Sequence, residues 1–302
     1  MRLVVTGRAG QVTRALQAAA GHGVVVIPAG RPEIDLLHPD GVDVALAALS
    51  PDVVVNAAAF TAVDLAETER EAAFAINGAG AGAVARAAAR LAVPVIHLST
   101  DYVFDGTNPV PYVETDAVAP ANVYGQSKLA GERAVAAATD NHAILRTSWV
   151  YAAAGKNFVA TMLRLAETRD EVGVVSDQQG APTYAPDIAD AVIAVARNLV
   201  ADPHEPRLRG IFHMTGAGAT TWAGFAEAIF ARAGARRLPR ARVRPILTAD
   251  YPTPARRPAN SRLDCGRLTS THGVTLPDWR DALDRCMDAI AAQRAADEDK
   301  KT

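Results

Sequence analysis

Short apolar runs rich in valine and isoleucine alternate with alanine-rich stretches through the first half of the chain. The runs are continuous, which is typical of strands buried on both faces of a parallel sheet. We therefore expect strands at 3–6, 24–27, 53–56, 95–98 and 143–145, separated by helices at 11–20, 39–49, 67–91 and 122–138. This order predicts an α/β fold in which a doubly wound parallel sheet carries helices on both faces.

Prolines and glycines interrupt this pattern in the second half of the chain, at 180–182, 203–206 and 252–258. Such punctuation is typical of a smaller lobe with long loops. Helical patterns recur there at 158–168, 186–200, 222–233 and 278–293. The sequence thus predicts a main domain over 1–150 and a smaller lobe over 151–302, some segments of which return to the main domain.

The composition excludes several classes of protein. The chain has 302 residues, 49% of them hydrophobic, which is enough for one large core and a smaller one. Its net charge is −2 and its basic residues form no long stripe, so nucleic acid is not expected as a partner. No segment approaches the roughly eighteen apolar residues of a membrane span, and the chain starts directly on a strand pattern without a signal peptide. We expect a cytoplasmic protein without membrane contact, in which Cys265 and Cys286 are reduced thiols.

A glycine-rich turn follows the first predicted strand. Gly7 and Gly10 allow a tight turn, and the helix that begins with Gln11 and Val12 would point its backbone N–H groups at a pyrophosphate. A turn at this place in a doubly wound fold predicts a dinucleotide site formed by these four residues. Thr13 stands where the usual GxxGxxG spacing has a third glycine, so it must fit where helix and strand pack closest.

The residues after the second predicted strand indicate which dinucleotide binds. NAD-selective sites place a carboxylate there for the ribose 2′-hydroxyl, whereas an arginine accommodates a 2′-phosphate. Arg31 occupies this region, so NADPH is expected to be preferred, with NADH as the alternative cofactor. Glu33 would partly offset Arg31. Asp35 either touches the adenine or caps the next segment, and Leu36 is expected in the same part of the site.

Small side chains follow the third predicted strand at Ala57, Ala58 and Ala59. Alanines would let a flat cofactor ring lie against the backbone at the carboxyl edge of the sheet. Ordinary close packing of a helix on a strand explains the same run equally well.

Tyr124 and Lys128 lie one turn apart on the predicted helix 122–138 and therefore share a face. A free tyrosine ionises near pH 10, so it acts as an acid or base at neutral pH only where a neighbour such as an ammonium group favours its phenolate. The pair is a candidate catalytic site, although a solvated helix pair has the same spacing.

A series of long motifs occurs in a fixed order along nearly the whole chain, at 7–12, 56–64, 99–106, 122–132, 146–151, 155–158, 177–183 and 251–264. They include Ser99-Thr-Asp-Tyr-Val-Phe and Tyr124-Gly-Gln-Ser-Lys128. In type, order and spacing they resemble the motifs of the dTDP-4-dehydrorhamnose reductases, which are extended short-chain dehydrogenases that reduce the 4-keto group of a nucleotide-linked 6-deoxyhexose. The resemblance implies a NAD(P)-binding Rossmann domain over 1–150 and a mainly substrate-binding lobe over 151–302.

The resemblance assigns the chemistry to Thr100, Tyr124 and Lys128. Tyr124 would donate a proton to the carbonyl oxygen as hydride reaches the carbon, and Lys128 would lower the phenol pKa and hold the nicotinamide ribose, so both also belong to the cofactor site. Thr100 would hydrogen-bond the substrate carbonyl or the phenol. The related 4,6-dehydratases carry an acidic residue where this chain has Tyr102. Simple carbonyl reduction is therefore expected instead of elimination, with Tyr102 at the sugar.

The same resemblance implies further substrate contacts. Asp101 either touches the sugar or caps the local turn, and Trp149 either stacks on the sugar or base or packs between the lobes. Asn157 lies in a shared motif and is expected at the substrate. Arg256 and Arg257, in a proline-stiffened loop, would bind the diphosphate, with surface salt bridging as the alternative.

The main functional expectation is reduction of a dTDP-4-keto-6-deoxy-L-hexose to dTDP-L-rhamnose. One alternative is a related deoxysugar reductase of an antibiotic pathway, such as a dTDP-dihydrostreptose synthase, which the alanine- and arginine-rich composition suggests. Another is a non-catalytic NADP-binding regulatory subunit, although a binding module has no need of Thr100, Tyr124 and Lys128 together.

The resemblance leaves a homodimer open. Some family members dimerise through Mg²⁺ held by acidic residues, one of them early in the first helix, but the stretch 11–16 contains no carboxylate. The histidines show no i, i+3 or i, i+4 pairing. We therefore expect no metal site and no metal-bridged dimer.

Overall fold

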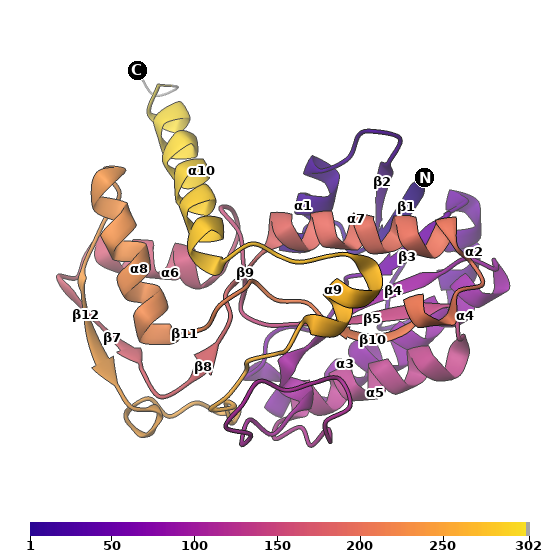
Figure 1. Cartoon of the computed structure of the whole chain (residues 1–302), viewed down its shortest axis with the longest axis horizontal. Coiled ribbons are helices and arrows are strands. Elements are labelled where there is room, and N and C mark those ends of the chain that lie inside the picture. Colours follow the sequence, from indigo (N-terminus) through magenta and orange to yellow (C-terminus); the bar gives the residue numbers. More distant parts are fainter. Residues whose placement is uncertain (300–302) are drawn as a thin grey trace.

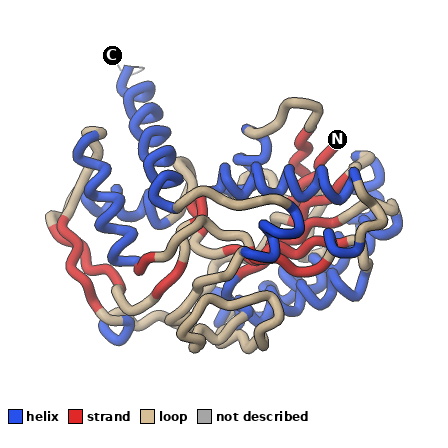
Figure 2. The backbone as a smooth tube through the Cα atoms, viewed as in Figure 1, coloured by secondary structure: helices blue, strands red, loops and turns tan. Residues whose placement is uncertain are grey.

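A six-stranded parallel sheet organises the larger part of the molecule in the computed structural model, which describes residues 1–299 (Figures 1 and 2). The strand order is β10-β5-β4-β3-β1-β2, so the winding reverses beside β1, where a doubly wound sheet opens a crevice for ligands. The strands are β1 Arg2–Thr6, β2 Val25–Ala29, β3 Val53–Asn56, β4 Val95–Thr100, β5 His142–Thr147 and β10 Gly210–His213.

Helices cover both faces of this sheet. One face packs on α1 (Gln11–Ala18), α7 (Ala185–Ala201) and α9 (Gly266–His272), and the other on α2 (Val42–Leu49), α4 (Ala81–Arg90) and α5 (Val123–Ala138). Side chains alternate between the layers, since Leu3 and Val5 join the first core and Val4 joins the second. The predicted doubly wound α/β fold class is confirmed.

The helix predicted at 67–91 is not continuous. It is divided into a 3₁₀ turn (Leu65–Glu67), α3 (Arg70–Phe74), a π-helical turn (Ala75–Gly80) and α4. Asn77 in the π turn accepts a hydrogen bond from Phe60 N and donates one to Phe60 O, at 2.8 and 3.1 Å. The irregularity therefore aims a buried amide at the loop after β3, and such turns are common at functional sites.

The smaller lobe lies beside the sheet domain in Figure 1 and has its own hydrophobic core. Its helices are α6 (Phe158–Ala166), α8 (Trp222–Ala235) and α10 (Trp279–Asp299). Strands β7 (Glu171–Val175) and β12 (Arg242–Ile246) pair in parallel, and two short pairs are formed by β6 (Val150–Tyr151) with β9 (Thr183–Tyr184) and by β8 (Gln179–Gly180) with β11 (Thr220–Thr221). None of these strands was expected from the apolar pattern, because they are short or, like β7 and β12, are not buried on both faces.

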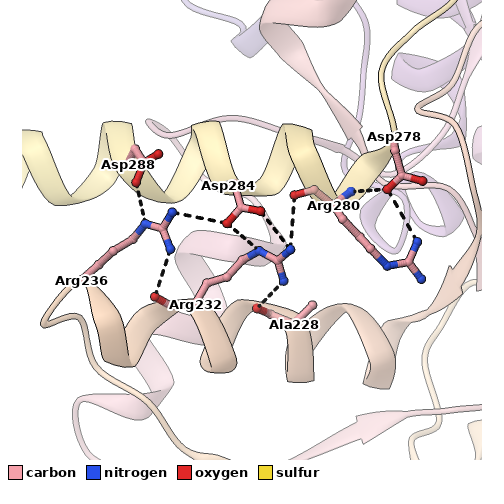
Figure 3. Close-up of polar contacts among 7 residues, drawn as sticks. All are labelled: Ala228, Arg232, Arg236, Asp278, Arg280, Asp284 and Asp288. Atoms are coloured by element: carbon pink, nitrogen blue, oxygen red, sulfur yellow. Dashed lines mark hydrogen bonds and ion pairs between the residues drawn. The ribbon is translucent and has the colours of Figure 1, made fainter.

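A ladder of ion pairs joins α8 to α10 on the outer side of the lobe (Figure 3). Arg232 holds Asp284 with two hydrogen bonds of 2.9 and 3.0 Å, and Arg236 reaches Asp288 at 2.7 Å and Asp284 at 3.3 Å.

Although α10 spans 21 residues, neither it nor any other helix within residues 1–299 is apolar enough to cross a membrane.

Two segments from the second half of the chain belong to the sheet domain. α7, expected at 186–200 in the smaller lobe, packs against α1 and places Ile188 and Val192 in the same core as Leu16. β10 extends the sheet beside β5. The chain therefore passes between the two parts more than once, and loops from both line the region between them.

Candidate active site

A cavity of ≈ 590 Å³ lies at the carboxyl ends of β1, β2 and β3. Its volume is within the range of small-molecule and cofactor sites. Eight of the predicted cofactor residues line it: Gly7, Gly10, Arg31, Asp35, Leu36, Ala57, Ala58 and Ala59. Val12 instead packs against the core between α1 and the sheet, and the Gln11 amide oxygen accepts a hydrogen bond from Asn157 at 3.0 Å.

The glycine turn has the form that a pyrophosphate site requires. Gly7 has φ +94°, which favours glycine, and its N–H donates to Ala29 O at 2.6 Å. Gly10 precedes α1 with no side-chain cap, so the first N–H groups of the helix are left for a ligand. Thr13 is 2% exposed and forms part of the cavity wall, so a threonine does fit at the third position of the turn.

A chain of buried hydrogen bonds holds the alanine edge of the cavity. The hydroxyl of Thr6 accepts from Ala57 N and Ala58 N, each at 3.1 Å, and donates to Asn56 at 2.7 Å. Asn56 in turn contacts His97 at 3.0 Å. The ends of β1, β3 and β4 are thereby tied together behind the place where a flat ring would lie.

Arg8 is a second cation at the cavity that the sequence did not single out. It lies in the glycine turn, lines the cavity with Arg31 and forms an ion pair with Glu33. The signal was available, because a basic residue inside the first turn of such a fold faces the same phosphates as the turn itself.

Tyr124 lies in the first turn of α5, where the Asn122 side chain caps the helix by accepting from Gly125 N at 2.8 Å. Tyr102 packs edge-on against it, with ring centroids 5.6 Å apart. Burial and the nearby Asp101 raise the pKa of Tyr124 to about 12, against a hydrogen bond with Thr100 that lowers it. The phenol is therefore neutral at physiological pH and holds a proton to give.

Lys128 is 3% exposed and donates from Nζ to Leu98 O at 2.7 Å. Burial lowers its pKa to about 8, opposed by the charge of Glu132. In this structure the Lys128 ammonium group binds a backbone carbonyl, and burial is the largest influence on the pKa of Tyr124.

Asp101 is a buried carboxyl next to the phenol. It is 3% exposed, accepts from the Thr100 hydroxyl at 3.1 Å, and has its pKa raised by burial to about 6, against hydrogen bonds from Ser261 and Thr100. Both the sugar-contacting and the local capping roles that the sequence left open remain compatible with this position.

The other predicted substrate residues have different surroundings in the structure. Trp149 has φ +48° and stacks on Trp222, with ring centroids 3.5 Å apart and planes 10° from parallel. Asn157 caps α6 and donates to Gln11 and Ala152 O, so its amide joins the glycine turn to the lobe. Arg257 pairs with Asp64 at 2.8 Å, whereas Arg256 is exposed.

Asn77 was missed by sequence reasoning. Besides Phe60 it binds the Ser127 hydroxyl at 2.9 Å, and Ser127 donates to Tyr124 O at 2.7 Å. The amide thus links the loop after β3 to the turn of α5 between Tyr124 and Lys128. No local pattern indicates this role, because its partners lie 17 and 50 residues away.

The wound sheet, the glycine turn and the Thr100, Tyr124 and Lys128 cluster together define a nucleotide-dependent oxidoreductase of the extended short-chain dehydrogenase/reductase class. A family model described as the RmlD substrate binding domain matches residues 1–292. The chain belongs to the dTDP-4-dehydrorhamnose reductase family.

Individual relatives agree with this assignment. The chain is 51% identical to a dTDP-4-dehydrorhamnose reductase of Sinorhizobium fredii, over 96% of this chain and 98% of the relative. It is 41% identical to that of Escherichia coli K12, over 96% and 98%. A crystal structure of the Clostridium acetobutylicum reductase aligns with a TM-score of 0.87 at 36% identity, over 95% and 99% of the two chains. That of Bacillus anthracis, in complex with NADP, aligns with a TM-score of 0.87 at 33% identity, over 95% and 98%.

Proposed function

We propose that this protein reduces the 4-keto group of dTDP-4-dehydrorhamnose with NADPH and releases dTDP-L-rhamnose. The observation that carries the proposal is the juxtaposition of a half-buried Tyr124 with Lys128 and Thr100, beside a cavity suited to a dinucleotide, in a chain of this family. Bound NADPH supplies the hydride.

The residues around the carbonyl carry out the proton transfer. Tyr124 gives its proton to the carbonyl oxygen, which becomes far more basic than a phenolate as it gains charge, so even a phenol with a pKa of about 12 is a sufficient acid. Thr100 hydrogen-bonds the same oxygen or the phenol. Lys128 stabilises the phenolate that remains and holds the nicotinamide ribose.

The remaining substrate contacts are proposed from position. Trp149, stacked on Trp222, and Tyr102, packed on Tyr124, would each offer apolar surface to the sugar or base. Asp101 directly precedes Tyr102 and would contact the sugar beside it. Arg256 is the better candidate for the diphosphate, because Arg257 is engaged by Asp64 and positions the loop instead. Asn157 shapes the junction between cofactor and substrate through its bonds to Gln11 and α6.

The experiment combines product identification with one substitution. Incubation with NADPH, dTDP-4-keto-6-deoxyglucose and a 3,5-epimerase is expected to oxidise the cofactor and yield dTDP-L-rhamnose by NMR. Tyr124→Phe should bind NADPH normally while turnover falls by roughly 10²–10⁴-fold.

Two outcomes would contradict the proposal. A ring-contracted product would identify a dihydrostreptose-type synthase, and NADPH binding without oxidation would identify a regulatory subunit. Unchanged turnover in Tyr124→Phe would remove the proton-donor role while leaving the reaction in place.

A further inference from the structure

Three side chains of α5 form a stripe against the end of β4. Tyr124, Lys128 and Glu132 follow one another at four-residue spacing, so they share one helix face. Each has a partner among three consecutive residues of the strand. Thr100 lies close enough to Tyr124 to lower the pKa of the phenol, Leu98 O accepts from Lys128 at 2.7 Å, and Ser99 donates to Glu132 at 2.6 Å.

Arg146 on β5 completes the third contact. It lies opposite Ser99 in the parallel register and holds Glu132 with two hydrogen bonds, Nε to Oε1 at 2.9 Å and Nη2 to Oε2 at 2.7 Å. Arg146 and Glu132 are only 2% and 3% exposed, and the guanidinium also lies over the Phe104 ring at 5.0 Å. One carboxylate therefore joins α5, β4 and β5 beneath the Tyr124 and Lys128 pair.

Stability alone does not account for an ion pair at this place. Removing two charges from water costs free energy that their attraction only partly offsets. Replacing a buried ion pair by apolar residues of similar volume therefore often leaves the stability of a protein unchanged or increases it. The carboxylate has instead a direct electrostatic consequence, since its charge favours the ammonium form of Lys128. His97 on β4 is a further ionisable group that senses the charge of Lys128, and Tyr124 lies one turn before Lys128 on the same helix. Arg146 faces Glu132, and Asp101 faces Tyr124. Burial lowers the pKa of His97 well below its usual value, so this ring carries no charge.

We propose that Glu132, fixed by Ser99 and Arg146, is a positioning residue that keeps α5 in register with β4 and maintains the charge of Lys128. It touches neither cofactor nor substrate and acts through the two residues one and two turns before it on the helix. The proposal rests on the proposed function in one respect, because it takes Tyr124 and Lys128 as the catalytic groups.

Two substitutions separate the geometric from the electrostatic part. Glu132→Gln keeps the shape and loses the charge, so the alkaline limb of the kcat profile should move about one pH unit lower and kcat at pH 8 should fall roughly fivefold. Glu132→Asp keeps the charge and shortens the side chain, so the limb should stay in place while kcat falls at every pH. Ser99→Ala, which leaves the ion pair intact, should lower kcat less than either and still fold.

A matched control is available in Asp187→Asn. Asp187 on α7 is also held by an arginine through two hydrogen bonds, from Nη1 and Nη2 of Arg285 at 2.7 and 2.8 Å, although the Arg285 side chain is 46% exposed. This variant should lose thermal stability but retain the wild-type kcat and pH profile. If Glu132→Gln and Ser99→Ala behave like Asp187→Asn, the contact is only structural and the inference is overturned.

The pH dependence of NADPH affinity, followed by cofactor fluorescence, gives a readout that needs no sugar substrate. The affinity for NADPH should weaken as Lys128 loses its proton. This weakening should begin at a lower pH in Glu132→Gln than in the wild type. If the wild type shows this loss of NADPH affinity at high pH but turns over no sugar, the proposed function is refuted and the role of Glu132 is still supported. Identical limbs in wild type and Glu132→Gln would refute the role of Glu132.

Discussion

At the residue scale, three charged side chains are predicted to set the dinucleotide preference. Arg8 and Arg31 line the cavity, and Glu33 is paired with Arg8. A 2′-phosphate is recognised by arginines through charge-assisted bonds, whereas a free 2′-hydroxyl gains nothing from them. We therefore expect the balance of these three residues, not Arg31 alone, to set the selectivity.

We expect Arg31→Ala to lower the ratio of kcat/KM for NADPH over NADH by roughly tenfold, and Arg8→Ala/Arg31→Ala to lower it further. Glu33→Gln should raise the ratio, because it frees Arg8 from its carboxylate. Steady-state kinetics with both cofactors measure this, and activity with NADH serves as the internal control. A double variant with the wild-type ratio would show that the preference is set elsewhere.

Lys128 sets the expected pH dependence of turnover. Its pKa is lowered by burial to about 8, so the ammonium form is complete well below pH 8 and is lost as the pH rises through that value. Because Tyr124 is protonated over the same range, kcat should be flat near neutrality, reach half its maximum near pH 8 and then decline. Stopped-flow turnover between pH 6 and about 10 tests this. A profile that stays flat beyond pH 9 would show that the ammonium charge of Lys128 is not required.

At the scale of elements, the contact between Trp149 and Trp222 joins the end of β5 to the start of α8. The Trp149 indole lies between Trp222 and Gly180, where an added Cβ would come within 2.4 Å of the ring. Phe158 of α6 supports Trp222 from the lobe, with ring centroids 4.6 Å apart. The backbone of Trp149 is held in the left-handed region by these surroundings, which is typical of residues at functional sites.

Trp222→Ala is expected to release the Trp149 indole, so KM for the sugar nucleotide should rise roughly tenfold while NADPH affinity stays unchanged. The stacked indoles should give an exciton couplet in the far-ultraviolet circular dichroism of the wild type, and the variant should lose it. The chain has three tryptophans, which makes this signal readable. Trp279→Phe is the control that should keep the couplet, and a wild-type KM in Trp222→Ala would contradict the role.

At the scale of the whole molecule, assembly is predicted not to depend on a metal ion. The first helix carries no acidic residue in its first turn, and within residues 1–299 no cluster of three or more histidine, cysteine, aspartate or glutamate side chains is placed to hold one. Size-exclusion chromatography with light scattering should give the same mass with EDTA and with added Mg²⁺. A mass that halves in EDTA would show a metal-bridged dimer assembled from residues of two chains.

Much of the main domain was predictable because its signals are local. The strand predicted at 53–56 agrees with β3, and the helix at 122–138 agrees with α5 and its Asn122 cap. The four-residue spacing of Tyr124 and Lys128 is sufficient to place both on one face of that helix. The smaller lobe was less predictable, because only alternate residues of β7 are buried and β12 has none, so neither strand carries the continuous apolar run of a strand buried on both faces.

Local periodicity and motif order by themselves determined the fold class and the family, and they supply the predicted reactive residues. Tertiary structure alone decided which groups each residue meets. It placed α7 on the sheet and paired Arg257 with Asp64 across 193 residues of chain. It also set the Asn77 amide and the ion pair of Glu132 with Arg146 beneath the predicted catalytic residues. The physical reason is that period and propensity act over a few neighbouring residues, whereas the partners of a buried polar group come from wherever the packing of helices on strands brings a complementary atom.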